Sequence, residues 1–450
     1  MLNKVVLFEY KKRNKEMKKD FKKIFKNSNV IYTVCCFVIV ILFIIIHLLF
    51  GVKMDSSDLF DLGLFSTAVL VFIVNSIANN LTNFFVEKFE DVEKMTNDYD
   101  KLSQMYAANT ILVKHINKTA STQNIIVGRK HTKSKRKEEN GVDVYTIPAA
   151  NAINLQNKLI EIKDDKTKKY QLPEEIRAIQ DKLLAAHSYS KIYNQLNIRL
   201  DNIQTSNGKV VFECSRTTYF DSLSTNRVLD YKINGITIRD MYAYGPFLSS
   251  LKESNLSNHI GFNGLVETED NYFIFILRHK RVSISKNTLQ ISVGASLKTK
   301  YALNEEMLVT KEGIVNAIKN EIEAELNLDK LDNYKDRREQ IFKGFCFDNV
   351  HYTYRELVEG GKPQLLFYAK INVPLAELRN AYSFGVSKRI RKKEKTLSVK
   401  HDGYKALYLH REKLKEIYIT PDGLTIEGKF YKSVPTMTAS LSLLLNSIGV

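Results

Sequence analysis

The pattern of apolar and polar positions divides the chain into a membrane-like part and a globular part. An apolar run without a formal charge covers residues 30–50, and a second, more polar run covers 62–86. Each run is long enough to cross a bilayer as a helix, which takes about 20 residues. The first run is too long for a cleaved signal peptide and no small-residue cleavage site follows it. The short connection between the runs therefore predicts a transmembrane helical hairpin over 29–86.

Flanking charge predicts the orientation of this hairpin. Ten Lys and Arg residues precede Asn29, whereas the connection carries only Lys53 together with three Asp residues. Since positively charged flanks remain on the cytoplasmic side, we expect both the N-terminus and everything after Val86 to be cytoplasmic. The basic tail, 1–28, either lies on anionic lipid or acts only as a topology determinant.

The second apolar run carries a stripe of polar side chains at helical spacing. Asn at membrane depth is costly unless it meets a partner or water. One interpretation is hydrogen bonding within the hairpin or a small oligomer; the other is a polar lining that faces water when several hairpins assemble. The stripe consists of Asn75, Ser76, Asn79, Asn80 and Asn83.

The segment 87–208 is expected to form a helical stalk and linker. Apolar residues recur at threes and fours over 89–106, which is typical of a helix continuing from the membrane. Further helices are predicted near 151–162 and 173–199. The basic run 128–141 is interpreted as a solvated loop.

From residue 209 the pattern changes to short strands separated by turn residues, with one long amphipathic helix among them. This alternation predicts an α/β (α+β) domain with a mixed sheet over 209–450. Strands are expected from 209, at 261–268, 272–278, 342–347 and 364–371, and the helix from Glu312 to Leu328.

That helix carries carboxylates at Glu312, Glu321 and Glu325. Glu321 and Glu325 are four residues apart and share a helix face, so they suit a divalent cation such as Mg²⁺ or Mn²⁺. An alternative is an ordinary amphipathic helix with solvent-facing acids, because an apolar ridge also recurs at i+4 spacing. The ridge consists of Ile314, Ile318, Ile322 and Leu326.

The net charge indicates the kind of partner that the protein binds, and the cysteines argue against a cysteine metal site and a disulfide framework. The formal net charge is +17, which indicates an anionic partner, either phospholipid, nucleotide or nucleic acid, without choosing among them. The four cysteines show no metal-ligand spacing and make no disulfide framework. The basic runs lack the aromatic interleaving of an RNA module, so nucleic acid is not an expected partner.

The order of strands and helix, with the spacing of the carboxylates, resembles the Nudix hydrolase superfamily. Its box runs Gly, five residues, Glu, seven residues, Arg-Glu, an aliphatic, any residue, Glu-Glu, any residue, Gly and an aliphatic. Matching positions are Glu312, Glu321, Ile322, Glu325 and Leu328; Asn320, Ala324 and Asn327 replace the Arg, one Glu and the late Gly. Gly294 is the displaced counterpart of the leading Gly.

The resemblance implies a nucleotide-binding cleft with a weakened catalytic box. Glu312, Glu321 and Glu325 would be its metal ligands, with Mg²⁺ or Mn²⁺ as the cofactor. Residues expected to contact nucleotide are Arg278, Lys280, Arg281 and Gly294. The losses at the box favour ligand recognition over hydrolysis.

A membrane hairpin before such a domain is similar to the transmembrane Nudix-like effectors of bacterial anti-phage signalling by cyclic oligonucleotides. This resemblance implies a homo-oligomer in the bacterial inner membrane, multi-pass with both termini cytoplasmic, which disrupts that membrane when a nucleotide messenger binds. The alternatives are a membrane-bound Nudix hydrolase of nucleoside diphosphate derivatives, and an adaptor whose basic surface binds protein or RNA.

Overall fold

The computed structural model describes residues 95–106, 110–116, 137–139, 142–185, 193–278, 287–393 and 403–449. They belong to one compact unit, Val92–Val450. The predicted hairpin, with its polar stripe Asn75, Ser76, Asn79, Asn80 and Asn83, lies outside the described residues. Among the residues that are described, no helix combines the length and apolar character needed to cross a membrane.

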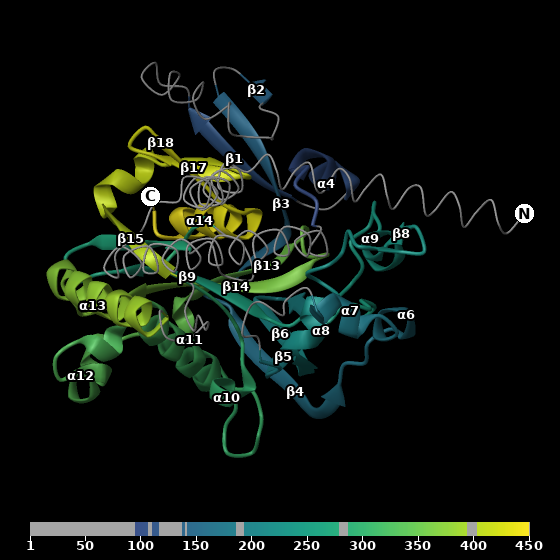
Figure 1. The fold of residues 1–450 in the computed structure, drawn as a ribbon, viewed down its shortest axis with the longest axis horizontal. Coiled ribbons are helices and arrows are strands. Elements are labelled where there is room, and N and C mark those ends of the chain that lie inside the picture. Colours follow the sequence, from purple (N-terminus) through teal and green to yellow (C-terminus); the bar gives the residue numbers. More distant parts are fainter. Residues whose placement is uncertain are drawn as a thin grey trace, which may run out of the picture. The chain divides into compact units, whose positions relative to one another are not determined.

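A mixed sheet forms the centre of the described part of the chain (Figure 1). The parallel pairing of β14 (Lys362–Lys370) with β9 (Gly261–Glu267) joins two groups of strands that are otherwise antiparallel. The main path runs β1 (Thr110–Ile116), β3 (Val142–Asn154), β13 (Val350–Glu356), β14 (Lys362–Lys370), β9 (Gly261–Glu267), β10 (Tyr272–Arg278) and β11 (Leu289–Gln290). Off this path, β2 (Lys137–Glu139) pairs with β3, β12 (Val293–Ser296) with β9, and β15 (Gly403–His410) with β10.

Helices cover both faces of this sheet, because successive strand residues point to opposite sides. One face is covered by α11 (Lys311–Leu326) and α13 (Leu375–Lys393), the other by α14 (Pro435–Ser447) (Figure 1). In β9, Phe262 packs in the core on the α11 side and Leu265 in the core on the α14 side. A small sheet also lies on the α14 side: β16 (Tyr418–Thr420), β17 (Gly423–Ile426) and β18 (Lys429–Lys432).

A further sheet of β4 (Leu159–Lys169), β6 (Lys209–Thr218) and β5 (Leu196–Ser206) packs into the core on the α11 side. Short elements complete the fold around these sheets. They are α6 (Glu174–Arg177), α7 (Gln180–Ala185), α8 (Tyr219–Ser224), β7 (Lys232–Ile233), β8 (Ile236–Thr237), α9 (Ile238–Tyr242), α10 (Thr299–Ala302), η1 (Leu328–Lys330), α12 (Tyr334–Ile341), η2 (Phe347–Asn349) and η3 (Arg411–Glu416).

The helix α4 (Tyr99–Met105) opens the described chain and packs on the turn between β13 and β14. Its buried Leu102 belongs to a cluster that includes Leu357 and Val358 of that turn. Tyr106, just after α4, donates a hydrogen bond from its hydroxyl to the Ala243 carbonyl. The first described segment of the chain is therefore attached to the globular core rather than projecting from it.

The α/β class with mixed sheets is confirmed, and so are the strands predicted near 209, 261–268, 272–278 and 364–371 and the helix starting at Glu312. The predicted helix near 151–162 is wrong, because these residues end β3 and begin β4, whose partners β13 and β6 are distant in sequence. Residues 342–347 do not form a strand. Phe342 and Phe345 follow α12 and Phe347 begins η2, and all three side chains are buried. The apolar residues of this segment therefore indicate burial, not a strand.

The stalk region also contributes strands to the domain. β1 and β3 extend the central sheet, and the boundary predicted at 209 falls inside the β5–β6 hairpin. These pairings join residues far apart in the chain, so local periodicity does not reveal them.

The helix α11 begins and ends at residues with suitable capping chemistry. The Thr310 side chain accepts a hydrogen bond from the Gly313 backbone N–H at 2.9 Å. Asn327 ends the helix in the left-handed conformation, with φ of 57°. The predicted apolar ridge is confirmed as a core element, since all four of its residues are buried.

Replacing Ile318 by Ala tests this packing. Its side chain is fully buried (0% exposed), so we expect the cavity to lower the free energy of unfolding by about 2–5 kcal/mol. Chemical denaturation of the purified chain measures the change, with Glu312→Ala on the exposed start of the same helix as control. Equal losses in the two variants would contradict the packing of α11 on the sheet.

Candidate functional site

A pocket of about 170 Å³ lies between the central sheet and the start of α14. Its floor consists of residues from several neighbouring strands: Asn263 from β9, Gly294 from β12, Glu356 from β13 and Gln364 from β14. Residues 434, 436 and 437 at the start of α14 form one wall, and Tyr219 of α8 is also part of the lining.

Strand register gathers the polar floor on one face of the sheet. Gly294 pairs with Asn263, Gln364 with both Gly261 and Tyr354, and Glu356 with Lys362. A side chain at Gly294 would begin 3.0 Å from Asn263 Oδ1, so glycine keeps this part of the floor open. Asn263 Nδ2 donates to Gln364 Oε1 at 3.2 Å, and Gln364 Nε2 donates to Glu356 Oε2 at 3.0 Å. A chain of amides thus leads to the Glu356 carboxylate.

A buried ion cluster forms part of the lining of the pocket. Glu359 lies 2.7 Å from Lys362 Nζ and 3.3 Å from Arg227 NH1. Burial works to raise the pKa of Glu359, but the adjacent Arg227 and Lys362 outweigh it and hold that pKa below its usual value. Burial and Arg227 lower the pKa of Lys362, which is only 2% exposed. Each buried charge of this cluster is stabilised by the opposite charge beside it.

The turn carrying this cluster is held by side chains that bond its backbone carbonyls. Gly360 and Gly361 have φ of 67° and 83°, which favours glycine at both positions. Arg239 donates to the Leu357 carbonyl at 2.9 Å and to the Val358 carbonyl at 2.7 Å. Arg355 Nε donates to the Gly361 carbonyl at 2.8 Å, and Asn226 Nδ2 to the Glu359 carbonyl at 2.9 Å. The turn 357–361 is therefore built around buried polar contacts.

Glu356 differs from Glu359 in its protonation. Burial, followed by repulsion from Glu359, raises the pKa of Glu356 to about 7. Its carboxylate accepts hydrogen bonds from Gln364 and from the Thr436 hydroxyl in the first turn of α14. A carboxyl that titrates near neutrality in a pocket is a candidate functional group.

His259 contributes a neutral imidazole near this cluster. Burial, with Lys362 and Arg227 nearby, lowers its pKa well below the usual value. Its Nε2 lies 3.0 Å from the hydroxyl of Ser296, which lines the pocket. His259 is therefore a buried hydrogen-bonding group and carries no charge at neutral pH.

Two of the residues predicted to contact nucleotide line this pocket. Arg278, at the end of β10, and Gly294, in β12, are both part of its wall, although 16 positions separate them in sequence. Lys280 and Arg281 lie outside the described residues. The pocket also brings Arg227 and Lys362 to the same place, so three cationic side chains surround it.

The carboxylates predicted to bind metal are not part of this pocket. Glu312 is exposed at the start of α11, Glu325 is half-buried, and Glu321 is buried in an ion pair with Lys298. Over the described ranges of the chain, no group of three or more His, Cys, Asp and Glu residues is placed to hold a metal ion. The metal site stays a prediction, and a cation there would have to displace Lys298 from Glu321.

Sequence reasoning did not select Arg227, His259, Glu356, Glu359 or Lys362. Three of these stand in the stretch ELVEGGK between two strands, where charged residues beside glycines are typical of an exposed turn. Tertiary contacts bury this turn, among them the packing of α4 and the side chains of Arg239 and Asn226. A local signal did exist, since Glu356, Glu359 and Lys362 occur within seven residues of adjoining strands.

Comparison with known proteins adds no relative: neither a protein-family model nor a curated protein matches the chain. The site is therefore defined by its own geometry. It offers cationic groups, amide hydrogen-bonding groups and one carboxyl with a near-neutral pKa, a set that suits an oxyanion attached to a polar organic group.

The raised pKa of Glu356 makes stability depend on pH. Between pH 4.5, its ordinary pKa, and about 7 the folded chain binds more protons here than the unfolded chain, so this group's contribution to stability falls as pH rises. We expect Glu356→Gln to gain in melting temperature relative to the native chain across that window. Thermal unfolding at a series of pH values measures it, with exposed Glu312→Gln as control. A difference that stays constant with pH would contradict the assignment.

Proposed function

We propose that this domain is the nucleotide-binding part of a membrane-anchored effector. The phosphate of a nucleotide messenger, a cyclic oligonucleotide in the leading case, binds among Arg227, Arg278 and Lys362. Binding promotes the assembly of N-terminal hairpins from several chains, and this assembly disrupts the inner membrane during anti-phage defence. The observation that carries this proposal is the convergence of three cationic side chains on one pocket.

The charge balance of the pocket supports an anionic ligand. Three cations face one ionised carboxylate, Glu359, and one carboxyl, Glu356, with a pKa of about 7. Arg and Lys donors make charge-assisted hydrogen bonds to phosphate oxygens. The amides of Asn263 and Gln364 supply the hydrogen-bonding groups that a base or ribose requires. The volume is similar to that of a cavity that holds one benzene ring, so it suits one phosphate or one ring of a larger ligand.

A route from the pocket towards the N-terminal segment supports the output step. The turn 357–361, which joins Glu356 to Lys362, packs on α4 through Leu357 and Val358. Arg239, which binds this turn, pairs with Asp230, and Asp230 accepts a hydrogen bond from the backbone N–H of Thr96 at 2.6 Å. A ligand that changes the turn therefore acts on the segment that follows the predicted hairpin. The ligand has this effect only if its affinity differs between the conformations of the turn before and after the change.

Direct binding tests the ligand site. Replacing Lys362 by Met, or Arg278 by Gln, removes a charged donor, which is worth about 1.5–3 kcal/mol. We expect affinity for the tightest ligand in a panel of cyclic oligonucleotides to fall about tenfold or more. Isothermal titration calorimetry on the detergent-solubilised chain measures the affinity.

The control for this test is Lys298→Met, because Lys298 pairs with Glu321 outside the pocket. It should bind like the native chain. If Lys298→Met and Glu321→Gln lower affinity while the pocket variants do not, the ligand site is at α11 and the proposal is wrong.

The alternative function is a membrane-bound Nudix hydrolase. Its support is the spacing of the carboxylates Glu321 and Glu325 on one face of α11. The Lys298–Glu321 ion pair does not favour it, since the expected metal ligand is already neutralised. Turnover of nucleoside diphosphate derivatives with Mg²⁺, abolished by Glu325→Gln, would establish the hydrolase and exclude a pure sensor.

Loosening α4 should separate binding from output. Leu102→Ala removes a buried side chain between α4 and the turn, so we expect unchanged ligand affinity and a reduced ligand-induced leak. Dye release from vesicles containing the whole chain measures the leak, and exposed Lys101→Ala on the same helix is the control. A full leak from Leu102→Ala would contradict transmission through α4.

A further inference from the structure

A loop beside α4 exposes two aromatic side chains that the ligand site does not use. Tyr244 is 65% exposed and Phe247 is 78% exposed. Pro246 between them is also exposed, whereas Ala243, just before the loop, is buried. Large aromatic side chains are costly to expose to water. Tyr244, Pro246 and Phe247 together form a short apolar surface, called here the aromatic tip, on a loop whose start at Ala243 is buried.

The tip is attached directly to the first described segment of the chain. Gly245 lies so close to Met105, in the last turn of α4, that an added Cβ would overlap the Met105 carbonyl group. On the preceding side, the Tyr106 hydroxyl donates to the Ala243 carbonyl. Figure 1 shows α4 and α9, the helix that leads into this loop, on the same side of the domain. The aromatic tip is thus fixed relative to α4.

Chain length limits how far this tip can lie from the bilayer. Twelve residues separate Val86, the end of the predicted hairpin, from Tyr99, the start of α4. Twelve residues span about 18 Å as a helix and at most about 41 Å when extended. Among the exposed aromatics of the described chain, Tyr244 and Phe247 adjoin the helix closest in sequence to that hairpin.

We propose that Tyr244 and Phe247 insert into the headgroup region of the bilayer and dock the domain on the membrane surface. This proposal rests on the membrane hairpin of the proposed function. Tyr and Phe suit the membrane–water boundary, because an apolar ring enters it while the Tyr hydroxyl stays hydrated. Docking holds α4 at the membrane surface, so that movements of the turn reach the membrane.

The absence of Trp from the sequence makes a direct test possible. Phe247→Trp creates a single fluorophore at the tip. Phe384→Trp creates one at a comparably exposed position (57%) on α13, which Figure 1 shows far from α4. Each full-length variant is reconstituted in vesicles of phosphatidylcholine and phosphatidylglycerol, with and without brominated acyl chains.

We expect a blue-shifted emission that brominated lipid quenches for Phe247→Trp, and an unshifted, unquenched emission for Phe384→Trp. An unquenched Phe247→Trp in chains that resist carbonate extraction would overturn docking while leaving the anchor intact. A blue shift that bromine does not quench would show that a second copy of the chain covers the loop, which also overturns it. Release by carbonate would show that the anchor itself fails, and the docking proposal with it.

Discussion

The ion cluster of Glu359 with Lys362 and Arg227 is the constraint on which the pocket depends. All three charges are removed from most water contact, and removing one partner of such a group costs about 3–5 kcal/mol because it leaves an uncompensated charge. Two glycines with positive φ make the turn that brings Lys362 back beside Glu359. Arg239, Asn226 and Arg355 then donate hydrogen bonds to the carbonyls of this turn, which fix its conformation.

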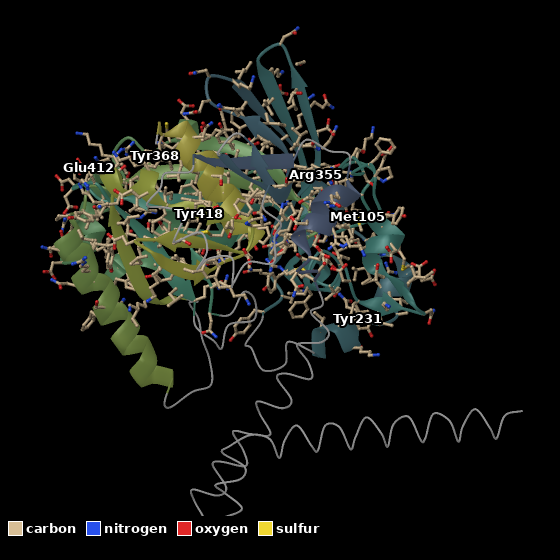
Figure 2. The ribbon with its side chains drawn as sticks, turned by 90° about the horizontal axis from the view of Figure 1, so that it is seen from above. Met105, Tyr231, Arg355, Tyr368, Glu412 and Tyr418 are labelled. Atoms are coloured by element: carbon tan, nitrogen blue, oxygen red, sulfur yellow. The ribbon has the colours of Figure 1, made fainter. Side chains whose placement is uncertain are left out.

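The pocket and α4 share contacts with the same turn. Glu356 and Lys362, at the two ends of the turn, face the pocket, while Leu357 and Val358, within it, pack against α4. Figure 2 shows Met105 of α4 and Arg355 of β13 on the same side of the domain, with Tyr368 and Glu412 elsewhere. In the proposed mechanism, a phosphate bound at Lys362 would draw this side chain away from Glu359 and weaken the contacts that hold the turn. Because the charges are buried, the conformation of the turn would then depend on the charge of the ligand.

Much of the fold follows from local sequence patterns, and the site does not. The amphipathic period of α11 and the strand–turn–strand pattern of β9 and β10 predict those elements well, because burial of one face decides them. The pattern predicts helix over 151–162, where the structure has strands, because the pairing of β3 with β13 and of β4 with β6 is decided by residues about 50 to 200 positions away. Arg278 and Gly294 were predicted from the order of elements and do line the pocket, whereas Arg227 and Lys362 reach it only through tertiary contacts. The Glu residues of α11 were selected by spacing, which does not reveal that Lys298 neutralises Glu321.

In the proposed mechanism, one ligand acts on both the turn 357–361 and α4. Hydrogen–deuterium exchange of the whole chain, with and without the tightest-binding cyclic oligonucleotide, measures this coupling. We expect changed protection in peptides that cover 356–362 and in those that cover 99–105, with little change in 311–326. Changed protection confined to 311–326, with the turn and α4 unaffected, would contradict it.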